Sequence, residues 1–477
     1  MTAKTQFSSL VGVVTTLCIS CAPLLATKGT NFLVIVSDDQ RPDTIAAHGN
    51  PRIQTPHLDQ LARNGLTFTK AVCANPICVA SRAELLTGTS GFTNGVMAMP
   101  GQKSNPATLP SWARTFSDAG YRTGYIGKWH TSGRPLDWGF KKTIGLYGNG
   151  GGRSPETKVD WKGSEITGYR GWIFQSNDGK EKYPARGIGL TPRTSEYIAD
   201  DAIKFISQKS TQPFFVHVNF TAPHDPLLTP PAWKDAYNPE AMEIPPNFLP
   251  EHPFDHGNFN GRDENLLPWP RTAPMVQDLL RMYYTVISDM DAQIGRILDA
   301  LDKSGKSQDT IVIFTSDHGI AVGSHGLRGK QNMYEHTINV PLIVSGPGIK
   351  GDGRQTNAQV YLRDLFPTTC DVAGLTVPPG VEGISFAAVL KGTQDKAHDH
   401  IFGYFRDSQR MIRNERFKLI YYPLLDQYQF FDLITDPYET TNLATSQGAT
   451  HREAFSQLKN KLTAWREDHP MPKIPAR

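Results

Sequence analysis

Three short runs of the chain are apolar at nearly every position rather than at alternate ones: Asn31–Ser37, Phe214–Phe220 and Thr310–Thr315. This pattern is typical of strands that are buried on both faces of a parallel sheet. Tyr121–Ile126 and Val340–Val344 are shorter apolar runs, and we predict that they form strands too.

Between these runs, apolar residues recur with the period of a helix. The predicted helices are His57–Asn64, Leu109–Ala119, Thr194–Ser207, Asp278–Ser304 and Leu362–Ala373. Strands that alternate with helices predict an α/β fold, with a large, mixed, mostly parallel sheet sandwiched by helices. Residues 131–192 and 227–274 interrupt this pattern, and we interpret both as irregular insertions.

After about Pro379 the pattern changes to short, partly alternating runs and a closing helix. These are His400–Phe405, Ser408–Arg413, Phe417–Tyr422, Gln429–Leu433 and the helix Arg452–His469. We predict a smaller C-terminal antiparallel sheet plus helix, so that residues 27–379 form the main domain and residues 380–477 an α+β subdomain.

The N-terminal residues 1–26 have the features of a secretory signal peptide. Lys4 precedes the apolar run Leu10–Ile19, and small residues follow through Ala22 and Ala26. We therefore expect the protein to be periplasmic or secreted, with cleavage of a lipoprotein before Cys21 as a weaker alternative. No later segment is long and apolar enough to span a membrane.

The composition is that of an ordinary soluble globular protein: 477 residues, 39% hydrophobic and 20% charged. A net charge of +3 is too small to indicate nucleic acid or an anionic membrane as a partner. Beyond the signal peptide only Cys73, Cys78 and Cys370 remain, which is no disulfide framework. Cys73 and Cys370 can either pair or stay as buried thiols, and Cys78 is then a candidate reactive thiol.

Cys78 precedes a predicted helix. Ser81 is a candidate N-cap, Arg82–Thr87 would form the first turns, and Gly88 would end the helix. Cys78 would then lie just before a helix N-terminus, where the backbone favours an anion, and Arg82 adds a cation.

Polar side chains follow four of the predicted strands directly. They are Asp38 and Asp39, Lys128 and His130, His224, and Asp317 and His318. Because the carboxyl ends of parallel strands share one edge of a sheet, we expect these side chains to meet there.

Three aspartates at one edge would repel one another unless a cation neutralised them, and carboxylates suit a hard cation such as Ca²⁺ or Mg²⁺. His318 is a ligand that suits Zn²⁺ or Mn²⁺ better. Together with Lys128, Lys330 and Arg82, such a site favours a small anion such as sulfate or phosphate, and the charge that develops when that anion is transferred.

These residues also carry a family resemblance. Cys78–Arg82 (CVASR), followed by Leu-Leu-Thr-Gly to Gly88, resembles the signature of the type I sulfatases, within the alkaline-phosphatase superfamily. Gly124–His130 is similar to the second signature of that family. The Asp317-His318 pair resembles the branch of iduronate-2-sulfatase and bacterial polysaccharide sulfatases, whereas many members have Asn at the second position. Ala80 stands where the commonest signature has Pro.

The resemblance implies that Cys78 is oxidised to formylglycine (3-oxoalanine), by a formylglycine-generating or an anaerobic maturation enzyme. The hydrated aldehyde attacks sulfur, and its second oxygen allows sulfate to be released. The implied ligands of one divalent cation, Ca²⁺ in preference to Mg²⁺ or Mn²⁺, are Asp38, Asp39, Asp317, His318 and the modified Cys78.

The resemblance implies further roles for the basic residues. Arg82 and Lys128 would orient the formylglycine, and His130 would act as a base in its regeneration. His224 and Lys330 would hold the sulfate, and His224 would protonate the leaving oxygen.

We therefore expect a sulfuric ester hydrolase that acts on a sulfated polysaccharide or oligosaccharide. Trp161, Arg170, Trp172 and Trp269 in the insertions are candidates to hold sugar rings and anions, although loop packing explains them equally well. A phosphodiesterase or phosphonate monoester hydrolase of the same superfamily is one alternative. A non-catalytic protein that binds sulfated glycans is another.

Overall fold

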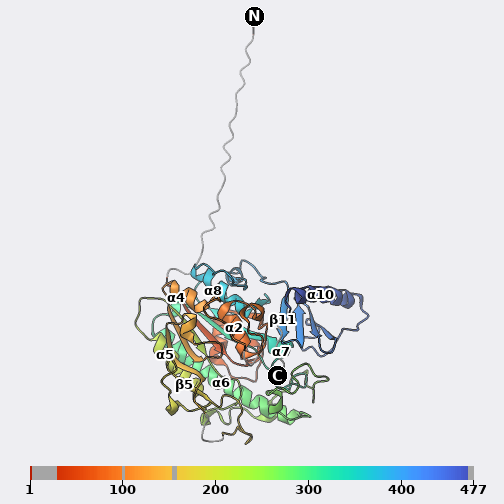
Figure 1. The fold of residues 1–477 in the computed structure, drawn as a ribbon, viewed down its shortest axis with the longest axis horizontal. Helices are drawn as coiled ribbons and strands as arrows, with labels where there is room; N and C mark the ends of the chain where they lie inside the picture. The colour runs from red at the N-terminus through yellow and green to blue at the C-terminus, as the bar shows by residue number, and fades with distance from the viewer. Residues whose placement is uncertain (3–28, 99–101, 153–157, 471–477) are drawn as a thin grey trace.

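The computed structural model describes residues 1–2, 29–98, 102–152 and 158–470 (Figure 1). Apart from its first two residues, the predicted signal peptide lies outside these ranges, as does Cys21. Among the described residues, no helix has the length and apolar character needed to cross a membrane.

The core of the main domain is a ten-stranded sheet in the order β10-β2-β8-β7-β1-β6-β3-β4-β5, with β9 paired to β2. The central strand β1 pairs in parallel with β6 and β7, and β6 pairs in parallel with β3. These four strands are β1 (Asn31–Ser37), β3 (Arg122–Lys128), β6 (Phe214–Asn219) and β7 (Thr310–Ser316).

The other strands are β2 (Leu66–Val72), β4 (Lys142–Asn149), β5 (Trp172–Gln175), β8 (Asn339–Ser345), β9 (Gln355–Thr356) and β10 (Val360–Tyr361). Strand β8 is antiparallel to both β7 and β2, and β5 is antiparallel to β4. The sheet is therefore mixed and mostly parallel, and the predicted α/β fold is confirmed.

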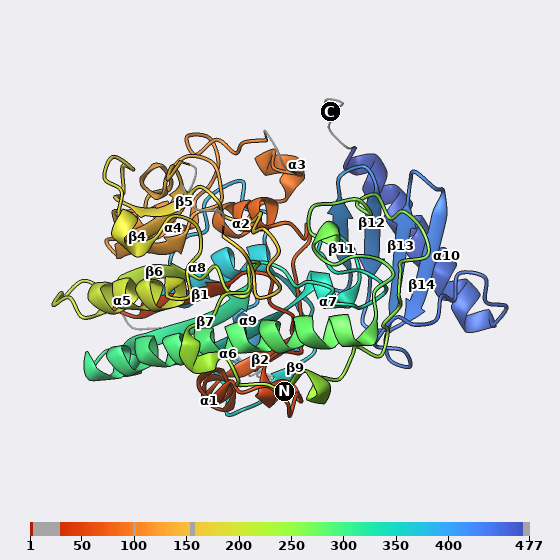
Figure 2. The ribbon, with the colours of Figure 1, turned by 90° about the horizontal axis from the view of Figure 1, so that it is seen from below.

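Helices cover both faces of the sheet (Figure 2). One hydrophobic core joins the sheet to α1 (Pro56–Asn64), α5 (Thr194–Ile206) and α6 (Ala273–Lys303). The opposite core joins it to α2 (Cys78–Thr87), α4 (Trp112–Asp118) and α8 (Leu365–Ala373). Alternate residues of β1 enter the two cores because successive strand side chains point to opposite faces, which explains why the whole strand is apolar.

The first insertion is more regular than predicted. Strands β4 and β5 lie within residues 131–192, which we interpreted as an irregular insertion, and Gly148 belongs to β4. Both strands are short, and β4 contains two glycines; β4 is ordered by pairing with β3, and β5 by pairing with β4. Cys73 and Cys370 are both buried free thiols, so they do not form the disulfide that the sequence left open.

The C-terminal part is a four-stranded antiparallel sheet with one long helix, as predicted. Its elements are β11 (Ile401–Phe405), β12 (Gln409–Arg413), β13 (Phe417–Tyr422), β14 (Gln427–Asp432) and α10 (Ala449–Asp468). Leu458 and Leu462 of α10 pack on the sheet. The short helices α3 (Gly91–Asn94), α7 (Glu335–Ile338) and α9 (Ala387–Leu390) lie in connecting segments.

A buried ion cluster joins the C-terminal sheet to helix α7, which directly precedes β8. Lys418 of β13 has a fully buried side chain, and its Nζ lies 3.1 Å from Glu335 Oε1 of α7 and 2.7 Å from Glu439 Oε1. Arg413 of β12 pairs with Glu335 as well.

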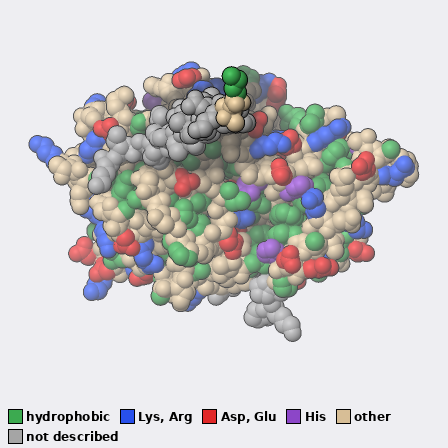
Figure 3. All heavy atoms as spheres, turned by 90° about the horizontal axis from the view of Figure 1, so that it is seen from above, with side chains coloured by type: hydrophobic (Ala, Val, Ile, Leu, Met, Phe, Trp, Pro, Cys, Tyr) green, Lys and Arg blue, Asp and Glu red, His purple; other side chains and the backbone are tan. Residues whose placement is uncertain are grey.

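The surface carries charges of both signs. On the face shown in Figure 3, basic and acidic side chains are interspersed, in keeping with the small net charge.

We expect Lys418→Met to destabilise the protein by about 3 kcal/mol, because it leaves Glu439 without its cation in a buried place. The free energy of unfolding in urea measures this effect. The matched control is Arg170→Met, which removes one partner of the exposed pair Arg170–Glu165 and should change stability by less than about 1 kcal/mol. Equal losses in the two variants would contradict the prediction.

Candidate active site

The ends of β1, β3, β6 and β7 meet at one edge of the sheet. Ser37 is in register with Ser316, so the residues that follow them, Asp38 and Asp317, emerge side by side. Lys128 is the last residue of β3, and His224 lies in the loop after β6. The structure thus brings together the side chains that the sequence placed at four separate strand ends.

Helix α2 carries Cys78 to this edge, although its start differs from our prediction. The helix begins at Cys78 itself, after Ile77, and Ser81 is an internal residue rather than the N-cap. The Ser81 hydroxyl instead donates to the backbone oxygen of Asp317 at 2.6 Å, which ties the helix to the end of β7. Gly88 ends the helix in the left-handed conformation (φ 66°), as predicted.

Four of the predicted ligand residues form one buried cluster. Ligand atoms of Asp38, Asp39, Cys78 and His318 all lie within 4.8 Å of one another. Cys78 Sγ is 3.2 Å from His318 Nε2 and 3.4 Å from Asp38 Oδ1. Two carboxylates, an imidazole and a sulfur atom at this spacing fit a divalent cation, because they supply both hard oxygen and nitrogen donors.

Asp317 lies beside this cluster. Its Oδ1 accepts from the backbone N–H groups of Asp39 (3.3 Å) and His318 (3.0 Å), and its Oδ2 accepts from Arg82 Nε at 2.9 Å. Burial, together with the charge of Asp38, raises the pKa of Asp317 to about 6. A cation would relieve the repulsion between the carboxylates at this point.

Buried cations surround the cluster. Lys330 Nζ lies 2.8 Å from Asp39 Oδ1 and 3.6 Å from Cys78 Sγ, and Lys128 pairs with Asp38. Burial alone would raise the pKa of the Cys78 thiol, but Lys128, Lys330 and His318 hold that pKa well below its usual value. The site therefore stabilises negative charge at the Cys78 side chain.

The two predicted acid–base histidines flank the cluster. His130 lies close enough to Cys78 for the two groups to shift each other's pKa, and its ring meets the ring of Trp172 edge-on at 5.3 Å. His224 Nε2 lies 3.9 Å from Asp39 Oδ2, while its Nδ1 lies 2.6 Å from the backbone oxygen of Asp225. Burial opposes protonation of His224, but Asp39 and Asp225 raise its pKa to about 9.

Two residues that contact the site were not predicted. The Tyr169 hydroxyl donates to Asp38 Oδ2 at 2.5 Å, and the Tyr169 ring packs edge-on against His224 at 4.9 Å. Asn219, the last residue of β6, accepts from Arg82 Nη1 at 2.9 Å. Asn219 is a polar residue at the carboxyl end of a predicted strand, the pattern that identified the other site residues. Nothing in the sequence around Tyr169 points to the site.

An outer layer of ions supports His224 and Lys330. Arg262 of the second insertion lies 3.0 Å from Asp225 Oδ1 and 2.6 Å from Asp263 Oδ1, and its Nε is 3.2 Å from Thr167 Oγ1 of the first insertion. Asp225 Oδ1 is 3.2 Å from His224 Nδ1, and Asp263 Oδ2 is 3.7 Å from Lys330 Nζ. Arg262 thus links both insertions to the two basic residues.

A carboxylate–histidine–cysteine cluster ringed by buried cations, at the strand ends of an α/β sheet, defines an enzyme that handles a small anion. The model of the sulfatase family matches residues 30–375. A second family model, described as N-sulphoglucosamine sulphohydrolase, C-terminal, matches residues 323–468. The chain belongs to the sulfatase family, whose members are sulfuric ester hydrolases of the alkaline-phosphatase superfamily.

Known proteins agree with this assignment. An arylsulfatase of Clostridium perfringens is 31% identical over 465 residues, which cover 91% of this chain and 93% of the relative. An ulvan-active sulfatase of Formosa agariphila is 29% identical, covering 91% and 80%. The fold is shared with BT4656, solved with its substrate D-glucosamine-2-N,6-O-disulfate, at a TM-score of 0.75 and 22% identity, covering 93% of this chain and 98% of that one.

We expect Arg262→Met to lower kcat/KM for a sulfate ester about tenfold, which is about 1.4 kcal/mol of barrier, because Asp225 and Asp263 lose their shared cation. Steady-state kinetics measure this loss. Arg186→Met is the matched control, since Arg186 pairs with the buried Asp201 away from the site, and its activity should stay within about twofold. Equal losses would show that Arg262 acts only through stability.

Proposed function

We propose that this sulfatase removes sulfate from a sulfated polysaccharide or oligosaccharide, with formylglycine made from Cys78 and one divalent cation. The observation that carries the proposal is the buried cluster of Asp38, Asp39, Cys78 and His318 with Lys128 and Lys330 around it. The carbohydrate part is supported by relatives named as an ulvan-active sulfatase and an N-acetylglucosamine-6-O-sulfatase.

The proposed metal ligands are Asp38, Asp39, Asp317, His318 and the modified Cys78. The oxygen donors of the aspartates favour Ca²⁺, while the imidazole of His318 also suits Mn²⁺. A bound cation would supply positive charge to a sulfate oxygen. Because these carboxylates are buried and repel one another, the cation would also stabilise the fold.

The chain itself supplies the remaining groups. As a hydrated aldehyde, formylglycine would provide an oxygen nucleophile and a second hydroxyl that permits sulfate release. Arg82 and Lys128 would hold this side chain through their contacts with the aspartates. His130, which lies beside the Cys78 side chain, would accept the proton of the second hydroxyl.

His224 and Lys330 are the proposed contacts of the sulfate ester. The Nδ1 of His224 is committed to Asp225, so Nε2 is the nitrogen that faces the site and would protonate the leaving oxygen. Lys330, already beside Cys78 and Asp39, would bind a sulfate oxygen. We also propose that the protein is exported to the periplasm or the medium, because residues 1–26 have the features of a signal peptide.

We expect co-expression with a formylglycine-generating enzyme to give sulfate release from sulfated oligosaccharides. Mass spectrometry should then find the Cys78 peptide about 18 Da lighter. Cys78→Ala should retain the fold and lose at least about a thousandfold in activity, since the nucleophile is gone. Full activity with an unmodified Cys78 would rule out the mechanism, and faster turnover of phosphonate monoesters than of sulfate esters would favour the alternative substrate class.

We expect a chelator to abolish activity and to lower the melting temperature, and Ca²⁺ to restore both. At a free cation concentration of about one hundred times the Kd, binding would add about 2.7 kcal/mol to the free energy of unfolding. Asp38→Asn is the control: its melting temperature should respond much less to the chelator, because one proposed ligand is lost. An unchanged melting temperature in the parent protein after complete metal removal would contradict the proposal.

A further inference from the structure

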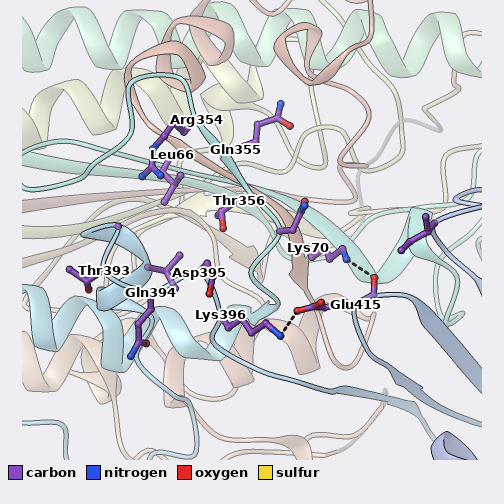
Figure 4. A pocket seen from close by; sticks show the side chains of 14 residues that line it. Leu66, Lys70, Arg354, Gln355, Thr356, Thr393, Gln394, Asp395, Lys396 and Glu415 are labelled. Atoms are coloured by element: carbon purple, nitrogen blue, oxygen red, sulfur yellow. Dashed lines mark hydrogen bonds and ion pairs between the residues drawn. The ribbon is translucent and has the colours of Figure 1, made fainter. Parts of the chain in front are cut away.

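A cavity of about 880 Å³ lies at the edge of the large sheet, and none of its lining residues belongs to the active site (Figure 4). One wall is formed by Leu66 and Lys70 of β2 together with β9, the edge strand paired to β2. Residues 392–396, after α9, form the opposite wall, and Glu415 of the β12–β13 turn closes one end. The volume is within the range of ligand-binding clefts.

The lining is mostly polar, which suits a hydrophilic ligand. It comprises the cations Lys70, Arg354 and Lys396, the anions Asp395 and Glu415, the amides Gln355, Asn357 and Gln394, and the hydroxyls Thr356 and Thr393. Among the described residues, no aromatic side chain lines it. Recognition in this cavity would therefore depend on hydrogen bonds and charge rather than on stacking against sugar rings.

Several N–H groups of the lining side chains are not used in hydrogen bonds within the described part of the protein. Lys70 Nζ uses one of its three donors, at 2.7 Å from the Glu415 backbone oxygen. Arg354 contacts the Lys350 backbone oxygen with one of its five N–H groups. Gln355 and Gln394 make no side-chain hydrogen bond to other described residues. A ligand rich in acceptor oxygens would satisfy these groups.

The charges also favour an anion. Lys396 Nζ pairs with Glu415 Oε1 at 2.8 Å, so these two charges balance. The remaining lining charges are those of Lys70 and Arg354 against the exposed carboxylate of Asp395, and Glu415 also lies close enough to act on Lys70. Burial and the neighbouring Arg413 lower the pKa of Lys70 by more than Glu335 and Glu415 raise it.

We propose that this cavity is a second binding site for the sulfated oligosaccharide chain, where Lys70 and Arg354 each hold a different sulfate group and the amides bond to sugar hydroxyls. The inference rests on the proposed function, since it takes the polymeric substrate as the ligand. Such a site would anchor a long chain without taking part in the reaction, so it would lower KM for polymers and leave small esters unaffected.

A more basic cavity, of about 760 Å³, lies at the ends of α5 and α6, and two of its four cations, Lys306 and Arg296, are used by the protein. Lys306 donates to the backbone oxygens of Ile206 and Gln208 at the end of α5. Arg296 pairs with Asp200 at 2.6 Å. This cavity supplies the matched control, because Lys209→Ala with Lys303→Ala also removes two positive charges, but from a different cavity.

The test measures binding of a dextran sulfate oligosaccharide by calorimetry to the full chain carrying Cys78→Ala. Saturating 4-nitrophenyl sulfate occupies the active site. We expect Lys70→Ala with Arg354→Ala to weaken the remaining binding at least about tenfold, or about 1.4 kcal/mol, and the Lys209/Lys303 control to leave it unchanged. Unsulfated dextran should not bind. Equal affinities in the two double variants, or no binding by the parent, would overturn the inference.

Turnover separates this inference from the proposed function. In the mature enzyme, Lys70→Ala with Arg354→Ala should leave kcat/KM for 4-nitrophenyl sulfate unchanged and raise KM about tenfold for a sulfated polysaccharide that the parent enzyme desulfates. An unchanged polymer KM overturns the second site while the sulfatase proposal stands. Absence of any sulfate release by the mature parent enzyme would overturn the proposed function itself.

Discussion

The structure depends on the balance of charge at the ends of the central strands. Asp38, Asp39 and Asp317 are all fully buried at one edge of the sheet, where uncompensated carboxylates would cost several kcal/mol each. Lys128, Lys330 and Arg82 compensate part of that charge. Parallel pairing of β1 with β6 and β7 brings these groups together, and helix α2 is tied to the same place through Ser81.

This balance continues outward in alternating layers. Behind the basic pair His224 and Lys330 lie Asp225 and Asp263, and behind those lies Arg262, which also contacts Thr167. Each layer carries the charge opposite to the one inside it, so no buried ion is left alone. Because Arg262 belongs to one insertion and Thr167 to the other, the same ions that support the site also hold the insertions over it.

Much of the fold and of the candidate site was predictable from the sequence. The uninterrupted apolar runs identified β1, β6 and β7, and the polar residues directly after them identified Asp38, Asp317 and His224 as neighbours. Strands β4 and β5 escaped prediction because they are short and lie within an irregular stretch of the sequence, where β4 pairs with β3 and β5 pairs with β4. Tyr169 escaped for a related reason, since its place beside Asp38 depends on how the insertion folds back.

The sequence by itself determined the fold class, the family and the stretch around Cys78 that carries the chemistry, because these depend on local pattern and on the order of motifs. The tertiary structure decided where the helix of Cys78 begins and which atoms surround its sulfur. It showed Ser81 bonded to the end of β7 instead of capping α2, and Asp317 turned toward Arg82. Contacts between residues far apart in the chain set these details, and one linear pattern cannot encode them.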